Sequence, residues 1–347
     1  NFLKNINTID NKKINFYEII NRTETKINKN LIFKKIKNKN ILITGGGGSI
    51  GSELAMQLIN YKPKKIYILD SSEINLFKIT EKLKKNKKDL KSIIPILGDC
   101  LDKKFLEFFF NKINLDMVYH TAAYKHVGFG QDNSYSMIKN NIIGTLNILD
   151  LSVNKKIKEF IFISTDKAVN PKSILGYSKK FCENIVSYYS KLNRNLTNMN
   201  FSIVRFGNVI GSSGSVIPIF INQLRNKQPL TVTHKKVERY FMSVEEAIKL
   251  IIYIGIIDKK RNLNIFALNM GKQIKIYEIA KRIIRLSGKI LKSKKNPKGD
   301  VSIKITGLKK GEKISEEIAL GKNMKKTSHP KIFLCEEYID LKNMDLK

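Results

Sequence analysis

The sequence predicts an α/β fold in which a doubly wound parallel sheet is followed by a smaller C-terminal domain. Three features point to this fold. Short apolar runs alternate with amphipathic stretches, the first run leads straight into a glycine-rich turn, and an aspartate closes the second run. Short, continuously apolar strands separated by helices are typical of a parallel sheet that helices cover on both faces.

The predicted elements alternate regularly up to residue 207 and less regularly beyond it. The runs that we expect to form strands are 39–44, 64–69, 92–97, 115–120, 158–164 and 200–206. Amphipathic stretches predict helices over 50–60, 73–85, 103–113, 134–154 and 176–192, then near 216–226, 244–258 and 276–288, with a further strand near 301–306. Residues 1–38 are polar and weakly patterned, and we expect a linker there with one short helix around 16–20.

Composition argues against several classes of function. The net charge of +34 at first suggests nucleic acid or anionic lipid as a partner. Only 8 of the 64 basic residues are Arg, however, and Lys, Asn and Ile are abundant throughout, which indicates background bias rather than a nucleic-acid surface. No run approaches the ~18 apolar residues of a membrane helix. The three cysteines and four histidines show neither disulfide nor metal spacing, so we expect no metal.

The glycine-rich turn TGGGGSIG, residues 44–51, joins the first predicted strand to a helix. Its glycines let the turn tighten, let backbone N–H groups approach a pyrophosphate, and let the helix pack on the strand. A pyrophosphate at the helix N-terminus meets unpaired N–H groups and the positive end of the helix dipole. The sequence therefore predicts a Rossmann-type dinucleotide site at Gly45, Gly48, Ser49, Ile50 and Gly51.

Later strand ends carry residues that suit the same cofactor. Asp70 follows Gly51 by 19 residues, where a carboxylate can accept both ribose hydroxyls of NAD but repels the 2′-phosphate of NADP. Asp99 follows the third strand, where a side chain can reach the adenine edge, and Ala122 follows the fourth, where small residues leave room for the cofactor. We therefore expect NAD.

The domains expected are a linker (1–38), an NAD-binding domain (39–207, with 244–270 returning to it) and a mostly substrate-binding domain (208–347).

A set of motifs between residues 122 and 313 resembles one family. The motifs are AAYKHV (122–127), STDKAVNP (164–171), RFGNVIGSSGSVIP (205–218), RYFM (239–242) and GEK (311–313). They are similar to those of the UDP-N-acetylglucosamine 4,6-dehydratases of bacterial polysaccharide biosynthesis, the CapD-like proteins, which are extended short-chain dehydrogenases/reductases. The resemblance runs from about Lys39 to about Leu320. It implies the extended short-chain dehydrogenase fold with a smaller C-terminal substrate-binding domain. It also implies a role in the biosynthesis of surface polysaccharides such as capsule or O-antigen.

The Tyr that short-chain dehydrogenases use in catalysis is missing from SILGYSKK, residues 173–180. Four residues before Lys179 stands Leu175, and Tyr177 is rotated by ~200° around a helix, so we expect Tyr177 on another face. In the longer branch of the family an apolar residue, commonly Met, replaces this Tyr, and Leu175 is similar to that arrangement. The resemblance therefore implies altered chemistry rather than lost chemistry.

The resemblance also implies a mechanism. NAD oxidises sugar C4, the C6 hydroxyl leaves as water while C5 loses a proton, and the hydride returns to C6. By the family motif, Asp166 protonates the C6 oxygen, Lys167 takes the C5 proton, Thr165 hydrogen-bonds near the C4 oxygen, and Lys179 holds the nicotinamide ribose. The missing Tyr favours retention at C5. The group that takes the C4 hydroxyl proton stays open.

The resemblance assigns substrate binding to polar residues of the motifs and of the second domain. N–H and hydroxyl groups in the turn after Asn208 suit a diphosphate, and the Arg239 guanidinium can bind a phosphate through two N–H groups. The full set is Lys125, His126, Asn208, Ser213, Ser215, Thr231, Arg239 and Glu312. Two other interpretations stay open: Lys125 as one more lysine of a lysine-rich chain, and Arg239 as part of a surface ion pair.

Two other functions remain as alternatives. One is a nucleotide-sugar 4-epimerase of the same fold, which ordinarily needs the Tyr and has no use for the Asp166–Lys167 pair. The other is a non-catalytic module that binds a dinucleotide or nucleic acid, which the missing Tyr and the charge favour. We expect a UDP-sugar substrate, a homo-oligomer and no specific nucleic acid. We place the catalytic part on the cytoplasmic side. Longer family members carry an N-terminal membrane anchor and this chain begins at Asn1, so we expect it to be a piece of such a protein.

Overall fold

A computed structural model of the chain describes residues 25–86, 90–193, 198–212, 214–257, 262–320 and 324–337, together with the backbone of two short strands at 8–9 and 12–13. The chain forms two compact units. The larger unit comprises Lys26–Phe206, Ile248–Asn269 and Glu317–Lys347. The smaller unit comprises Asn1–Thr25, Gly207–Ala247 and Met270–Glu316.

A nine-stranded sheet forms the centre of the larger unit, in the order β16-β17-β13-β8-β7-β6-β3-β4-β5. All neighbours from β13 to β5 are parallel, and β17 and β16 extend the sheet antiparallel beyond β13. The strands are β3 (Asn40–Thr44), β4 (Lys65–Asp70), β5 (Ile93–Leu97), β6 (Met117–His120), β7 (Glu159–Ile163), β8 (Asn200–Arg205), β13 (Leu263–Leu268), β16 (Met324–Lys326) and β17 (Ile332–Cys335). The predicted parallel sheet is confirmed, and its first six strands lie where the apolar runs placed them.

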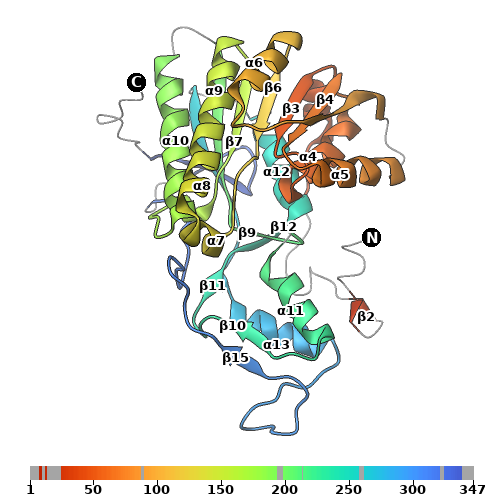
Figure 1. Cartoon of the computed structure of the whole chain (residues 1–347), viewed down its shortest axis with the longest axis vertical. Helices are drawn as coiled ribbons and strands as arrows, with labels where there is room; N and C mark the ends of the chain where they lie inside the picture. Colours follow the sequence, from red (N-terminus) through yellow and green to blue (C-terminus); the bar gives the residue numbers. More distant parts are fainter. Residues whose placement is uncertain are drawn as a thin grey trace. The chain divides into compact units, whose positions relative to one another are not determined.

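Helices cover both faces of this sheet (Figure 1). They are α3 (Lys29–Ile36), α4 (Ser49–Leu58), α5 (Glu73–Lys85), α6 (Lys103–Lys112), α7 (Val127–Asp132), α8 (Ser134–Ile138), α9 (Gly144–Asn154), α10 (Ile174–Leu192) and α12 (Val244–Ile254), with a π-helical turn at Lys139–Ile143. Apolar side chains of α6, α9 and α10 form one core with alternate strand residues such as Val118 and Phe160. Tyr119, the neighbour of Val118, lies on the opposite face, beside Gly255 just after α12.

Helix α3 is a departure from the linker expected at the start of the chain. The Asn28 side chain accepts the N–H groups of Asn30 and Leu31 and so caps the helix. Ile32 and Ile36, spaced by one helical turn, are completely buried. Four apolar residues in a segment of eight, three of them consecutive, give too short a pattern to predict a helix. The short helix expected around 16–20 lies outside the described residues.

Beyond residue 206, the described part of the smaller unit contains three strand pairs and two helices. The pairs are β9 (Asn208–Ile210) with β12 (Phe241–Ser243), β10 (Leu230–Val232) with β15 (Ile303–Ile305), and β11 (Glu238–Arg239) with β14 (Ile274–Lys275). The helices are α11 (Val216–Arg225) and α13 (Ile276–Leu286). Their apolar faces share one core that includes Phe220 and Ile283. At the start of the chain, β1 (Thr8–Ile9) pairs with β2 (Lys12–Lys13).

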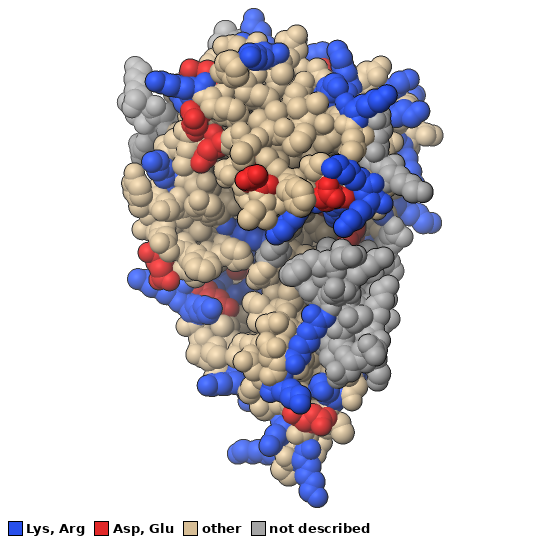
Figure 2. All heavy atoms as spheres, turned by 45° about the vertical axis from the view of Figure 1, so that its right-hand side comes forward, with Lys and Arg blue, Asp and Glu red and all other residues tan. Residues whose placement is uncertain are grey.

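On the face drawn in Figure 2, Lys and Arg are spread over the surface, with Asp and Glu among them. All three cysteines are buried as free thiols, as their spacing predicted. Among the described residues, no helix combines the length and the apolar character that crossing a membrane requires.

Candidate active site

The glycine-rich turn between β3 and α4 has no room for side chains on its inner side. Gly45 has a φ of 61°, and a Cβ there would lie 2.6 Å from the Cα of Ala122. A Cβ on Gly51 would lie 2.5 Å from the carbonyl oxygen of Gly45. Gly48 differs, because its Cβ would meet only the Gly45 oxygen, at 3.2 Å, so the turn stays open at the N-terminus of α4. Ser49 and Ile50 begin that helix, where N–H groups can receive a phosphate.

Asp70 lies at the end of β4 and binds the same turn. Its Oδ2 accepts the N–H of Gly47 at 2.9 Å and its Oδ1 accepts the N–H of Ser72 at 2.9 Å. Each carboxylate oxygen has a further lone pair, so the group can still accept the hydroxyls of a ribose. Asp99 follows β5, and its carboxylate accepts the N–H of Leu101. The open glycine turn with an acceptor beside it fits the adenosine half of NAD.

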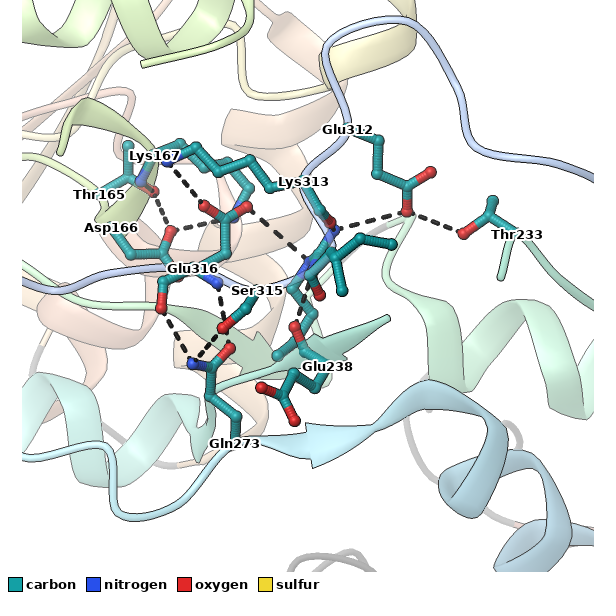
Figure 3. A network of polar contacts seen from close by, with 12 residues as sticks. Thr165, Asp166, Lys167, Thr233, Glu238, Gln273, Glu312, Lys313, Ser315 and Glu316 are labelled. Atoms are coloured by element: carbon teal, nitrogen blue, oxygen red, sulfur yellow. Dashed lines mark hydrogen bonds and ion pairs between the residues drawn. The ribbon is translucent and has the colours of Figure 1, made fainter. Parts of the chain in front are cut away.

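Thr165, Asp166 and Lys167 form a tight polar group directly after β7. Asp166 is completely buried, and its Oδ1 accepts hydrogen bonds from Thr165 Oγ1 and Lys167 Nζ, both at 2.9 Å (Figure 3). Its Oδ2 is also buried and finds no hydrogen-bond partner among the described residues. An unsatisfied buried carboxylate oxygen is costly, so it needs an explanation such as a ligand or a catalytic role. This orphaned oxygen marks Asp166 as the centre of the candidate site.

Helix α10 supplies Lys179 from beside this group. Ser173 caps the helix, and Leu175 is buried whereas Tyr177 is 58% exposed, so Tyr177 points away as its position predicted. Lys179 Nζ donates to the carbonyl oxygen of Ile163 at 2.8 Å. Desolvation by burial lowers the pKa of Lys179 to about 8, although Cys182 and Glu183 act in the opposite direction. A helix therefore holds one nearly buried ammonium group at the end of β7.

The sequence did not reveal Asn141, a buried residue of the π-helical turn. Its Oδ1 accepts the N–H of Tyr124 at 2.8 Å, and its Nδ2 donates to the Tyr124 carbonyl oxygen at 3.2 Å and to Ser178 Oγ at 3.0 Å. The side chain thus fixes the segment just before Lys125 and His126 against α10. Both of these side chains are exposed, and partial desolvation lowers the pKa of each. A short run of NNII gives no signal for such a turn.

Thr231 and Ser215, predicted substrate residues of the smaller unit, have different surroundings. Thr231 on β10 is held by Gln223, whose Nε2 donates to Thr231 Oγ1 at 2.8 Å. Ser215 lies just before α11, and its hydroxyl is buried with no partner in the described part of the chain. Asn208 opens β9, and its N–H donates to the carbonyl oxygen of Tyr240. Ser213 lies outside the described residues.

Arg239 is buried, and its N–H groups contact the segment around Glu312. Nη1 donates to the carbonyl oxygens of Glu238 and Ile314 at 2.7 and 3.1 Å, and Nη2 donates to the Lys313 carbonyl oxygen at 2.7 Å. Glu312 Oε1 lies 3.4 Å from Nη2 and accepts the hydroxyl of Thr233 at 2.9 Å (Figure 3). Because Arg239 is buried, it is not part of a surface ion pair. A phosphate could reach Nη2 only by displacing the Glu312 carboxylate.

Comparisons with known proteins give a consistent family and fold. A family model described as "Polysaccharide biosynthesis protein" matches residues 41–337. The capsular polysaccharide biosynthesis protein CapD of Staphylococcus aureus is 38% identical over 312 residues, which cover 90% of this chain and 50% of that protein. The chain thus spans about half the length of this relative.

Two further relatives carry names that differ in reaction. A UDP-N-acetylglucosamine 4,6-dehydratase (inverting) of Campylobacter jejuni is 34% identical over 216 residues, which cover 62% of each chain. A UDP-glucose 4-epimerase of Rickettsia rickettsii is 30% identical over 297 residues, or 83% of this chain and 80% of that one.

Solved structures match the fold over most of the chain. Pen from Bacillus thuringiensis aligns with a TM-score of 0.76 at 29% identity, covering 86% of this chain and 88% of its own. DesIV from Streptomyces venezuelae, a dTDP-glucose 4,6-dehydratase with NAD bound, aligns with a TM-score of 0.67 at 19% identity, covering 80% and 88%, and supports the fold alone. The predicted extended short-chain dehydrogenase fold is thereby confirmed.

Proposed function

The chain belongs to the polysaccharide biosynthesis protein family, and we propose from this that it catalyses the NAD-dependent 4,6-dehydration of UDP-N-acetylglucosamine. The product would be a UDP-4-keto-6-deoxy sugar for a surface polysaccharide or glycan. One observation carries the choice of reaction: the buried Asp166 carboxylate bonded to both Thr165 and Lys167. A dehydratase needs an acid and a base beside adjacent carbons, and consecutive residues at a strand end can provide both.

NAD is the proposed cofactor because the open glycine turn and Asp70 fit its adenosine half. When bound, NAD accepts a hydride from sugar C4 and returns it to C6. Lys179 would hold the nicotinamide ribose through its ammonium, and Asp99 and Ala122 would flank the adenine and the cofactor backbone. These assignments rest on the positions of the residues at successive strand ends.

The Thr165–Asp166 hydrogen bond offers a route for the C4 hydroxyl proton without a Tyr. The Thr165 hydroxyl can accept the proton from O4 while it passes its own proton to Asp166 Oδ1, 2.9 Å away. Asp166 then holds the acid form that gives a proton to the departing C6 oxygen, which leaves as water. Lys167, in its neutral form, takes the C5 proton, and its ammonium exchanges with solvent before it reprotonates C5. The O4 proton thus leaves in the water molecule, and Asp166 returns to its carboxylate form.

The residues assigned to the substrate keep their proposed roles. Asn208, Ser213, Ser215, Thr231, Arg239 and Glu312 would bind the UDP moiety, and Lys125 and His126 the sugar. The Ser215 hydroxyl, buried without a partner among the described residues, is the strongest of these assignments, because a ligand oxygen would satisfy it. A homo-oligomer, an N-terminal membrane anchor and a cytoplasmic catalytic part remain part of the proposal.

Incubation with NAD and UDP-N-acetylglucosamine in D₂O, followed by mass spectrometry and NMR, tests the reaction. We expect loss of one water and deuterium at C5, with C5 configuration retained. Inversion at C5, as the name of the Campylobacter relative states for that enzyme, would overturn the stereochemical part alone. A sugar that changes configuration at C4 without losing water would establish the epimerase instead. The name of the Rickettsia relative is the reason to test for this reaction. Unchanged sugar in folded, NAD-loaded protein would refute both.

A further inference from the structure

A buried ion pair lies behind the Thr165–Lys167 turn and has no part in the proposed mechanism. Arg205 of β8 and Glu183 of α10 both have completely buried side chains. Arg205 Nε and Nη2 donate to Glu183 Oε1 and Oε2, each at 2.7 Å, in a bidentate arrangement. Arg205 Nη1 donates to Glu337 Oε1 at 2.6 Å. Apolar residues of similar volume would stabilise such a site as well or better, so stability alone is a weak reason for this pair.

Glu183 is joined to the strand that ends at the catalytic turn. Ser164, the residue just before Thr165, donates its hydroxyl to Glu183 Oε1 at 2.7 Å. One helical turn earlier, Lys179 donates to the carbonyl oxygen of Ile163. Two successive turns of α10 therefore hold two successive residues at the end of β7.

Strand β8 holds the turn from its other side. The N–H of Ser164 donates to the Val204 carbonyl oxygen at 2.8 Å, and the N–H of Asp166 donates to the Phe206 carbonyl oxygen at 3.1 Å. Arg205 lies between these two acceptors, and its guanidinium ties β8 to Glu183 on α10. The turn that carries Asp166 is thus fixed to a strand and to a helix that are themselves joined by the bidentate pair.

We infer that Ser164, Glu183 and Arg205 are positioning residues that set the Asp166 carboxylate in register with Lys179. The inference rests on the proposed function, because it gives the Asp166 group and Lys179 a joint task. Arg205 begins the RFGN segment of the sequence, and unlike Asn208 of the same segment it has no role in the proposed function. Glu337 lies on the far side of Arg205 and attaches the C-terminal segment, since its Oε1 also accepts the N–H of Leu320 at 2.8 Å.

Ser164→Ala tests the inference with the least disturbance. It removes the hydroxyl that joins β7 to Glu183 and leaves the Arg205–Glu183 pair in place. Ser202→Ala is the matched control, because Ser202 is a fully buried serine of the neighbouring β8 whose hydroxyl finds no partner among the described residues. Ser164→Thr keeps a hydroxyl and serves as the rescue variant. Two quantities are measured: kcat and KM for UDP-N-acetylglucosamine, and amide hydrogen exchange of the peptide spanning 160–170.

We expect Ser164→Ala to lower kcat about tenfold at unchanged KM and to speed exchange within 164–168 while peptides elsewhere exchange as in the wild type. A tenfold loss corresponds to about 1.4 kcal/mol in the barrier. Ser202→Ala should match the wild type in both measurements, and Ser164→Thr should recover most of the rate. Wild-type kcat and exchange in Ser164→Ala would overturn the inference, as would faster exchange throughout the protein. An inactive wild type would refute the proposed function, and the exchange measurement would still decide whether Ser164 holds the turn.

Discussion

Replacement of Lys179 by Met should make the folded protein more stable at neutral pH while it removes activity. Lys179 is almost completely buried, and its Nζ lies 4.5 Å from the centre of the Phe162 ring. Met has a similar length and carries no charge, so the variant keeps the packing of α10 and loses only the ammonium group. The expected gain arises because an ammonium costs free energy to bury.

The size of the gain follows from the pKa of the Lys179 side chain. Burial lowers this pKa from an ordinary 10.5 to about 8. The difference corresponds to about 3 kcal/mol of destabilisation at pH 7. Between pH 8 and 10.5 the unfolded chain binds more protons than the folded chain, so wild-type stability rises with pH over this window.

Urea unfolding at pH 7 and pH 9.5 measures the effect, with activity followed in parallel. We expect Lys179→Met to exceed the wild type by about 2 kcal/mol at pH 7, because the lost hydrogen bond to Ile163 removes about 1 kcal/mol of the gain. At pH 9.5 the buried amine is neutral, so the gap between the two proteins should shrink by about 1–2 kcal/mol. Lys78→Met, at an exposed position on α5, is the control. A gap that stays constant with pH would show that burial does not perturb Lys179.

Three further outcomes can be measured. Gly45→Ala should unfold at lower temperature and bind NAD weakly, because its Cβ would meet Ala122 at 2.6 Å. Gly48→Ala should keep wild-type stability and lose only NAD affinity, and calorimetry separates the two effects. Asp70→Asn should weaken NAD binding about tenfold, since an amide has one acceptor oxygen for two backbone N–H groups, and equal affinity by titration would contradict this. Arg239→Lys should lower stability by about 2 kcal/mol in urea unfolding, because an ammonium cannot reach three separate carbonyl oxygens; an unchanged midpoint would count against it.

The sequence predicted the fold well where short apolar runs recur regularly along the chain. Runs such as KNILIT and KEFIFIS predicted β3 and β7 because parallel strands buried on both faces need continuous apolar residues. Strand β13 carries an equally apolar run, LNIFAL, but it lies beyond the regular alternation and pairs with β8 across a long insertion. Such pairing depends on tertiary contacts that a local pattern does not contain.

The sequence allowed candidate site residues to be chosen, but not their contacts to be predicted. The motifs identified Asp166, Lys167 and Lys179 because their spacing from strand ends and in α10 is local. The double contact of Asn141 with Tyr124 depends on a π-helical turn, for which the sequence gives no rule. The orphaned oxygen of Asp166 likewise depends on how completely the surrounding chain excludes water.

The antiparallel pair β16–β17 has a consequence for any shortened version of this protein. Strand β13 is almost entirely buried, and β17 satisfies the N–H and C=O groups along one of its sides. Outermost of all lies β16, which is fully exposed and carries Lys325 and Lys326. Charged residues on an outer strand prevent two molecules from pairing through their sheets. A chain cut before Met324 would present the bare backbone of an apolar strand to its neighbours, and we expect it to self-associate during expression.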